Sequence, residues 1–433
     1  MIKVFTAFSG YDSQCLDLER CGLDYDLVGW SEIDKYAIRA HDALFPQYAD
    51  RNFGDISKVD WKQVPDFDLF TYSFPCQDLS KAGKQRGFNK GSGTRSSLLW
   101  ECQRAIEEKT PQYLVMENVS DLVSKKFVGM YNEWMRYLQS MGYRSYSAVL
   151  NAKNYGIPQN RARVYCVSIL GEGDAYYFPD KMPLKKRLID MLEDSVDESY
   201  YLSKEKLENF IFNCEDSSEK AVLGWTRDNQ GNIVNRHPVS IANCITSNKR
   251  DNTQNFVFDP TIQFLGDLNP NSKFGNHAKQ QNIVIGVDGI SMCLTAQHAK
   301  HEFKIAEPLR IHQATEQGYT EVYPGGVFDA SYPNSTTRRG RVQDGGTICP
   351  TLCAKQTEIP QYDGYRIRRL TERECYRLMG LTEGEIDKIQ SAGIPKTWQY
   401  HTAGNSIVVD VLAAIFSHLF LNKKNDNQQL KLF

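Results

Sequence analysis

The first 170 residues alternate between short apolar runs and longer amphipathic stretches. The apolar runs are rich in β-branched and aromatic residues and end at turn residues, so they predict buried strands at 2–8, 26–30, 67–72, 113–116, 143–150 and 164–170. Apolar residues recur at helical spacing between them, which predicts helices at 14–20, 35–44, 97–108 and 127–141. This alternation is typical of an α/β fold with a doubly wound, mostly parallel sheet.

The pattern of residue types changes after residue 171. Asn, Asp, Gly and short β-like runs dominate, and helical spacing returns only at 371–379 and in the almost wholly apolar stretch 407–420. We therefore expect one domain built from 1–172 and 396–433. It would enclose a smaller, mostly β insertion with its hinge at 173–395.

Two reactive side chains follow neighbouring strands. Cys76 lies in a Pro-Cys turn after the strand 67–72, and Glu117 follows the strand 113–116. The carboxyl ends of neighbouring parallel strands share one edge of the sheet, where α/β folds bind ligands. A thiol and a carboxylate there are what an enzyme needs to attack a pyrimidine ring through sulfur. A lone cysteine is more often a buried apolar residue, but the pairing of both groups at strand ends favours a site.

The first strand, turn and helix indicate a nucleoside pocket beside that edge. Gly10 breaks the first strand, and Glu32 follows the second strand about 20 positions later, the separation at which a carboxylate meets ribose hydroxyls. The turn has only one of the three glycines that a dinucleotide pyrophosphate needs. An adenosine-type ligand is therefore favoured over NAD or FAD.

These residues carry a resemblance to the DNA (cytosine-5)-methyltransferase family, bacterial or phage type. Phe8-Ser9-Gly10, Glu32-Ile33-Asp34 and Gly54-Asp55-Ile56 resemble its S-adenosylmethionine motifs, and Phe74-Pro75-Cys76-Gln77 and Glu117-Asn118-Val119 its catalytic motifs. The paired-arginine motif matches 159–163, and the last two motifs match 369–375 and 404–407. The match covers roughly the first 170 and last 65 residues. Asp12 and Ser13 stand where many members have glycines, and Ile33 where an aromatic residue is common.

The resemblance implies a role for each matching position. Cys76 would be the nucleophile and Glu117 the residue that protonates the base, with Arg163, or its neighbour Arg161, on the O2 edge of the cytosine. The residues implied for S-adenosylmethionine are Phe8, Ser9, Gly10, Glu32, Ile33, Asp55, Ile56, Pro75, Leu98, Asn405, Ser406 and Ile407. The residues expected to bind DNA in the loop after the nucleophile are Gln77, Ser80, Lys84 and Gln85.

The chemistry expected of such a site needs no metal. Cytosine C5 is a poor nucleophile, and thiolate attack at C6 turns it into an enamine-like carbon that can take a methyl group. The target lies inside a stacked duplex, so the base must be flipped into the pocket. The loop 77–88 after Cys76 has the glycines and donors of a lid, although its position alone is also that of an ordinary surface loop.

Composition changes this interpretation little. The chain has 433 residues, 41% hydrophobic and 24% charged, with a net charge of −2. Nothing resembles a signal peptide, and the composition led us to expect no membrane span. Eleven cysteines without CxxC pairs favour a reducing, cytoplasmic environment over disulfides or a zinc site. The expected state is a monomer on double-stranded DNA, with or without a companion restriction endonuclease.

DNA contacts beyond the lid are expected in the insertion. The stretch 333–377 holds nine basic and five acidic residues, and its predicted basic edge is Arg338, Arg339 and Arg341. Three heptads, 241–247, 290–296 and 348–354, share one apolar pattern and each leads into a polar stretch with a lysine. Similar framework strands of one sheet are the favoured explanation. A repeated DNA-reading device is the alternative, and the two are compatible.

Other functions fit less well. An RNA cytosine-5 methyltransferase would share every catalytic residue, but the large insertion favours reading a duplex sequence. A catalytically silent relative is disfavoured because Cys76, Glu117 and both arginines are present. A flavin or NAD oxidoreductase would need the missing glycines.

Overall fold

A computed structural model describes residues 1–75, 98–186, 188–201 and 366–421, and between 202 and 365 it describes the strands and a few further residues. The described chain divides into two compact units. The first unit comprises residues 1–193, 291–300 and 371–433, and the second comprises 194–290 and 301–370.

A six-stranded sheet with the order β2-β1-β3-β4-β7-β5 organises the first unit. β1, β2, β3 and β4 run parallel, β7 runs antiparallel to β4 and to β5, and β7 is therefore the one strand of this sheet with the opposite direction. The mostly parallel α/β sheet predicted from the sequence is confirmed. The strands are β1 (Ile2–Ala7), β2 (Tyr25–Ser31), β3 (Leu69–Tyr72), β4 (Tyr113–Val119), β5 (Tyr143–Asn151) and β7 (Ala162–Leu170).

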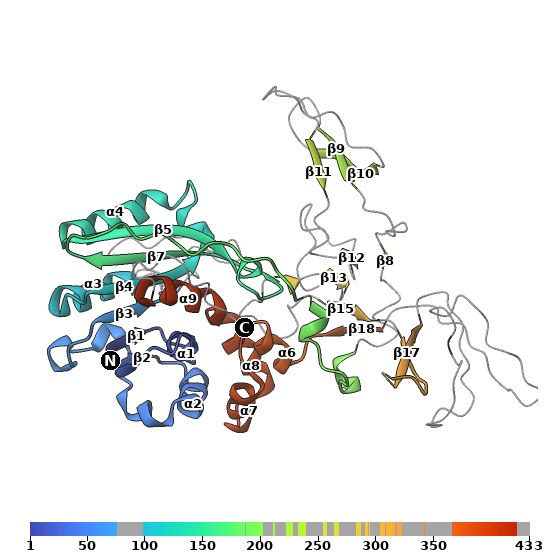
Figure 1. The fold of residues 1–433 in the computed structure, drawn as a ribbon, viewed down its shortest axis with the longest axis horizontal. Helices are drawn as coiled ribbons and strands as arrows, with labels where there is room; N and C mark the ends of the chain where they lie inside the picture. The colour runs from blue at the N-terminus through green and yellow to red at the C-terminus, as the bar shows by residue number, and fades with distance from the viewer. Residues whose placement is uncertain are drawn as a thin grey trace, which may run out of the picture. The chain divides into compact units, whose positions relative to one another are not determined.

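Helices cover this sheet and close the first unit (Figure 1). A continuous apolar core joins strand residues such as Phe70 and Met116 to Ile106 of α3 and Trp134 of α4. α1 packs against α9, so the apolar helix expected near the end of the chain returns to the first strands. The helices are α1 (Ser13–Arg20), α2 (Lys35–Leu44), α3 (Leu99–Lys109), α4 (Val128–Ser140), α6 (Glu372–Arg377), α7 (Glu383–Ser391), α8 (Lys396–Asn405) and α9 (Val409–Phe416).

The C-terminal helices differ from the sequence expectation in one respect. Within the described chain, the stretch Lys396–Leu421 is long and apolar enough to cross a membrane by length and composition, and we expected no such stretch. The helical path is interrupted at 406–408, and most of its apolar window is buried inside the protein. The apolar side chains of α9 therefore serve the core of the first unit.

The boundaries of the units also differ from those expected. The sequence placed 173–395 together, whereas residues 173–193, 291–300 and 371–395 belong to the first unit. Part of the second heptad forms β14 (Ser291–Met292), which pairs with β6 (Gln159–Asn160) in that unit. The first and third heptads lie outside the described residues, so the proposal of one common framework sheet stays a prediction.

Over the residues that are described, the second unit consists mostly of strands, with one short 3-10 helix at Glu198–Tyr200. Three sheets are present, with the orders β10-β9-β11, β18-β15-β13-β12-β8 and β16-β17. Their bounds are β8 (Ile211–Phe212), β9 (Val222–Arg227), β10 (Ile233–Val239), β11 (Gln254–Val257), β12 (Phe264–Asp267), β13 (Ile283–Gly286), β15 (Lys304–Glu307), β16 (Leu309–His312), β17 (Tyr319–Val322) and β18 (Arg366–Arg369).

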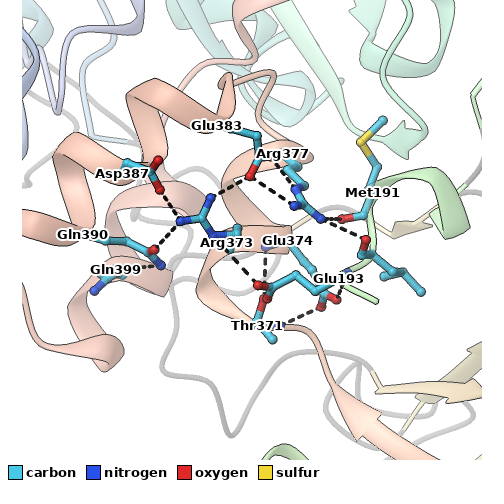
Figure 2. Close-up of polar contacts among 11 residues, drawn as sticks. Met191, Glu193, Thr371, Arg373, Glu374, Arg377, Glu383, Asp387, Gln390 and Gln399 are labelled. Carbon is cyan, nitrogen blue, oxygen red and sulfur yellow. Dashed lines mark hydrogen bonds and ion pairs between the residues drawn. The ribbon is translucent and has the colours of Figure 1, made fainter. Parts of the chain in front are cut away.

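A polar network ties together two places where the chain crosses between the units. Glu193 is the last residue before one crossing and Thr371 is the first residue after another. The buried Glu374 carboxylate accepts the backbone N–H of Glu193 at 2.9 Å and that of Thr371 at 2.8 Å, and the Thr371 hydroxyl donates to the Glu193 carboxylate. Figure 2 shows this network and the arginines Arg373 and Arg377 that extend it toward α7. Both crossings are thereby anchored to one turn of the first unit.

Candidate active site

A carboxylate, a hydroxyl and a guanidinium meet at the carboxyl ends of β3 and β4. The Ser73 hydroxyl donates to Glu117 Oε2 at 2.8 Å and lies 3.2 Å from the Glu117 carbonyl oxygen. Arg163 Nε lies 3.3 Å from Glu117 Oε1. Arg163 reaches this edge because β7 is antiparallel to β4, so that its first residues pair with the last residues of β4. The predicted Glu117 and Arg163 are thus brought together.

The segment that leads to Cys76, the predicted nucleophile, is fixed from the same strand. The buried Asn118 side chain donates to the Phe74 carbonyl at 2.9 Å and accepts the backbone N–H of Val119. Asn118 therefore orients the backbone on both sides of this edge. Pro75 is half-buried and ends the described part of this segment, and Cys76 lies outside it. Ser73, which sequence reasoning did not assign to the site, adds a second contact between the two segments.

Arg161 has different surroundings from Arg163. Its side chain is 4% exposed, and its guanidinium donates to the carbonyls of Leu294, Gly404 and Ser406 at 2.6–3.1 Å. Next to it, the buried Gln159 side chain donates to the Leu378 carbonyl and accepts the Leu294 N–H. These contacts place Arg161 in the framework that holds the 404–406 turn.

The turn between β1 and α1 has an unusual backbone. Phe8, Gly10 and Asp12 have φ values of 56°, 60° and 65°, the left-handed region that L-residues other than glycine rarely adopt. The Ser9 N–H donates to the Ser31 carbonyl, which joins the turn to the end of β2. Backbone strain of this kind persists only where neighbouring contacts fix it.

Glu32 receives three backbone donors. Its Oε2 accepts the Gly10 N–H at 3.0 Å, and its Oε1 accepts the N–H groups of Ile33 and Asp34 at 2.7 and 2.9 Å. Burial raises the pKa of Glu32, and these three hydrogen bonds act against that shift. A carboxylate has about four lone-pair sites, so Oε2 retains one for a ligand hydroxyl.

Asn52 connects the backbone of Glu32 to residues 54–56, the next segment predicted to bind the cofactor. Its side chain accepts the N–H groups of Glu32 and Gly54 and donates to the Glu32 carbonyl. Asp55 follows, and its carboxylate accepts the N–H and hydroxyl of Ser57, which lowers its pKa. Asn52 was not identified from the sequence, because its amide contacts depend on two segments meeting in space.

The remaining predicted cofactor residues occupy three settings. The Ile33 side chain is 72% exposed, whereas Ile56 and Ile407 are buried. Leu98 precedes α3 and packs against the apolar core. Asn405, the last residue of α8, is exposed, and in the break after it the Ser406 hydroxyl lies 3.1 Å from that of Ser13 at the start of α1. The cofactor motifs from both ends of the chain therefore meet at the β1–α1 turn.

Several predicted residues cannot be placed. The positions outside the described residues are Cys76, Gln77, Ser80, Lys84, Gln85, Arg338, Arg339 and Arg341. Within the described chain, no group of three or more His, Cys, Asp and Glu residues is arranged to hold a metal ion.

Comparison with known proteins gives a consistent picture. A model of the C-5 cytosine-specific DNA methylase family matches residues 2–421. The orphan methyltransferase M.Rho11sI of Bacillus phage rho11s is 30% identical, over 98% of this chain and 99% of its own length. The type II methyltransferase M2.ScrFI of Lactococcus lactis subsp. cremoris is 39% identical, over 50% of this chain and 76% of its own length.

A solved structure shares the fold. The S. pombe Dnmt2 methyltransferase matches with a TM-score of 0.58 and 17% identity, over 98% of this chain and 100% of its own. The family match spans nearly the whole sequence, and the phage relative aligns from end to end. This chain is an enzyme that belongs to the C-5 cytosine-specific DNA methylase family.

Proposed function

We propose that this protein transfers the methyl group of S-adenosylmethionine to C5 of a flipped cytosine within a specific sequence of double-stranded DNA. The proposed path runs through a covalent bond between Cys76 and cytosine C6. The observation that carries it is the Ser73–Glu117–Arg163 cluster at the edge of the sheet. Ser73, one member of this cluster, is three residues before Cys76 in the sequence.

Residues at the β1–α1 turn fit the cofactor. Glu32 has one acceptor site left for a ribose hydroxyl, because its other sites accept backbone N–H groups. The exposed Ile33 offers an apolar surface to the adenine ring, and Asp55 offers an acceptor for its amino group. Bound S-adenosylmethionine supplies an electrophilic methyl group on a sulfonium.

The chain's own residues would activate the base. The Cys76 thiolate forms the bond to C6, and the electron pair of the C5–C6 double bond becomes available at C5. Glu117 holds a proton at cytosine N3, which allows the ring to accept the negative charge. After C5 takes the methyl group, loss of the C5 proton restores the double bond and expels the Cys76 sulfur.

Arg163 and Ser73 would orient this carboxylate. Each binds a different oxygen of Glu117, so together they fix its plane. Arg163 is thereby also held next to the base, where its remaining donors could bind the O2 edge. We assign Arg161, with its three carbonyl partners, to holding the 404–406 turn instead of contacting the base.

The substrate's sequence would be read by the second unit and by the loop after Cys76. Its strands supply a framework, and the arginines at 338, 339 and 341 are the proposed basic edge. Both orphan and type II methyltransferases occur among the relatives, so the proposal covers an enzyme with or without a companion endonuclease.

A methyl-transfer assay tests this function. Protein is incubated with radiolabelled S-adenosylmethionine and either cytosine-unmethylated genomic DNA or total RNA, and bisulfite sequencing then locates the modified bases. We expect 5-methylcytosine in duplex DNA at one short sequence. Incorporation into RNA alone would favour the RNA methyltransferase and reject this proposal.

A cysteine pair tests the covalent step. Cys76→Ser should abolish transfer and leave cofactor binding intact, since serine is a far weaker nucleophile at neutral pH. The matched control is Cys21→Ser, because the half-buried Cys21 makes hydrogen bonds to Ala413 and Ser417 that a hydroxyl can replace. DNA carrying 5-fluorocytosine should trap wild type as a covalent complex that survives denaturing electrophoresis. Normal turnover by Cys76→Ser would show that another group attacks the base.

A further inference from the structure

Asp12 directs its carboxylate into the protein at the β1–α1 turn. It precedes α1, but its side chain makes no capping hydrogen bond to that helix. The side chain is fully buried, and Oδ2 accepts the Thr6 hydroxyl of β1 at 2.8 Å. The turn is therefore linked through Asp12 to the strand that precedes it.

His41 of α2 faces the same carboxylate. His41 Nε2 lies 3.8 Å from Asp12 Oδ2, and the imidazole is fully buried. The ring stacks on Trp30 of β2 with 3.6 Å between centroids, and Nδ1 lies 3.2 Å from the Asp42 carboxylate. Asp12 thus sits where β1, β2, α1 and α2 meet.

Burial sets the protonation of this pair. Desolvation raises the pKa of Asp12 to about 7, against the hydrogen bond from Thr6. Desolvation alone lowers the pKa of His41 to about 3. Near neutral pH the imidazole is therefore neutral and the Asp12 carboxyl is only partly ionised. Asp12 can therefore contact Thr6 and His41 without forming a buried ion pair.

We propose that Asp12 is a positioning residue for cofactor binding, because its hydrogen bond from the Thr6 hydroxyl, here called the Asp12 tether, holds the strained 8–12 turn in the conformation that receives S-adenosylmethionine. This inference rests on the proposed function. Two of the three left-handed residues in the turn are Phe8 and Asp12, for which that backbone is unfavourable. The Asp12 tether connects this turn to β1 through a side-chain hydrogen bond, and it takes the place of the conformational freedom that glycine would supply.

The test separates the tether from the backbone conformation. Asp12→Gly accepts the positive φ and loses the tether, whereas Asp12→Asn keeps an oxygen for the Thr6 hydroxyl. Thr6→Val removes the same hydrogen bond from its other end with little change in shape. The matched control is Thr71→Val, because Thr71 is the register partner of Thr6 in β3, is equally buried, and has a hydroxyl without a hydrogen-bond partner in the described structure.

We expect Asp12→Gly and Thr6→Val to weaken S-adenosylmethionine binding by about tenfold in calorimetry, the scale of one buried hydrogen bond. The KM for the cofactor should rise equally, while the KM for DNA and kcat at saturating cofactor stay within about twofold. Asp12→Asn and Thr71→Val should bind as wild type does. Hydrogen exchange of the Gly10 amide without cofactor should accelerate only in Asp12→Gly and Thr6→Val.

Each failure has a distinct signature. If wild type does not bind S-adenosylmethionine, the proposed function is wrong, and the Gly10 exchange rates still report whether the tether holds the turn. If wild type binds but Asp12→Gly and Thr6→Val match it, the inference is overturned. An equal loss in Thr71→Val would also overturn it, because the effect would then belong to sheet packing. If Asp12→Gly does not fold, the cofactor binding of Thr6→Val alone tests the inference.

Discussion

The buried Asp12 carboxyl should make the stability of the first unit depend on pH, and Asp12→Asn should remove that dependence. Asparagine has nearly the same shape and keeps an acceptor for Thr6. The substitution therefore changes the ionisation of this position more than its packing. His41 stays in place in both proteins and its contribution cancels in the comparison.

The direction follows from the pKa in each state. The pKa of Asp12 is raised from 3.8 to about 7 in the folded protein, so the folded state binds the proton more tightly than the unfolded state between these values. Stability is then fully present below the unfolded pKa and is lost as pH rises through the folded pKa. At 1.36 kcal/mol per pKa unit, the total loss is about 4 kcal/mol, of which about 3 kcal/mol falls between about pH 5 and pH 8.

Urea denaturation at several pH values measures this difference. Five of the six tryptophans lie in the first unit, so their fluorescence reports on it. We expect the free energy of unfolding of Asp12→Asn, relative to wild type, to increase by about 3 kcal/mol from about pH 5 to pH 8 and to level off above it. The control is Asp50→Asn, which makes the same substitution at an exposed side chain.

A constant difference between Asp12→Asn and wild type over this range would refute the reasoning. It would mean that Asp12 ionises without penalty in the folded protein, so that either water or His41 compensates its charge. A difference of the opposite slope would show that Asp12 is a stabilising anion paired with a protonated His41.

Three further predictions concern other parts of the molecule. Arg161→Lys should lower the free energy of unfolding by about 3 kcal/mol in urea titrations, because an ammonium cannot serve three carbonyls in the guanidinium geometry; an unchanged midpoint would contradict the framework role. Glu374→Gln should lower the melting temperature, since the N–H groups of Glu193 and Thr371 bind different oxygens of Glu374 and the amide NH2 of glutamine cannot accept either of them; an unchanged melting temperature would argue against the anchor. Alanine at a phosphate-binding arginine should reduce the salt slope of DNA binding by about 1, whereas alanine at a guanine-reading one should relax a single base preference; if all three variants bind cognate and scrambled duplexes as wild type does, the reader lies elsewhere. The arginines to be tested are Arg338, Arg339 and Arg341.

Much of the first unit could be predicted from the sequence, because its signals are local. Apolar runs bounded by turns located the six strands of the main sheet within a few residues, and helical spacing located α1 to α4. The helices α7 and α8 were missed, since a short charged helix and a helix of mixed polarity give weak periodicity.

The sequence by itself determined which chemical groups stand at the ends of strands, and that was enough to place Glu117 beside the chain leading to Cys76. Strand direction was decided only in the tertiary structure: β7 runs against β4, and this brings Arg163 to Glu117 while Arg161 turns toward the carbonyls of the 404–406 turn. The tertiary structure also decided that Asp12 is buried against Thr6 and His41. The hydrogen bond from Thr6 joins side chains 6 residues apart and the contact with His41 spans 29 positions, and neither separation follows from a periodic pattern in the sequence. Periodicity reports which face of an element is buried, whereas contacts between polar groups depend on how the elements meet.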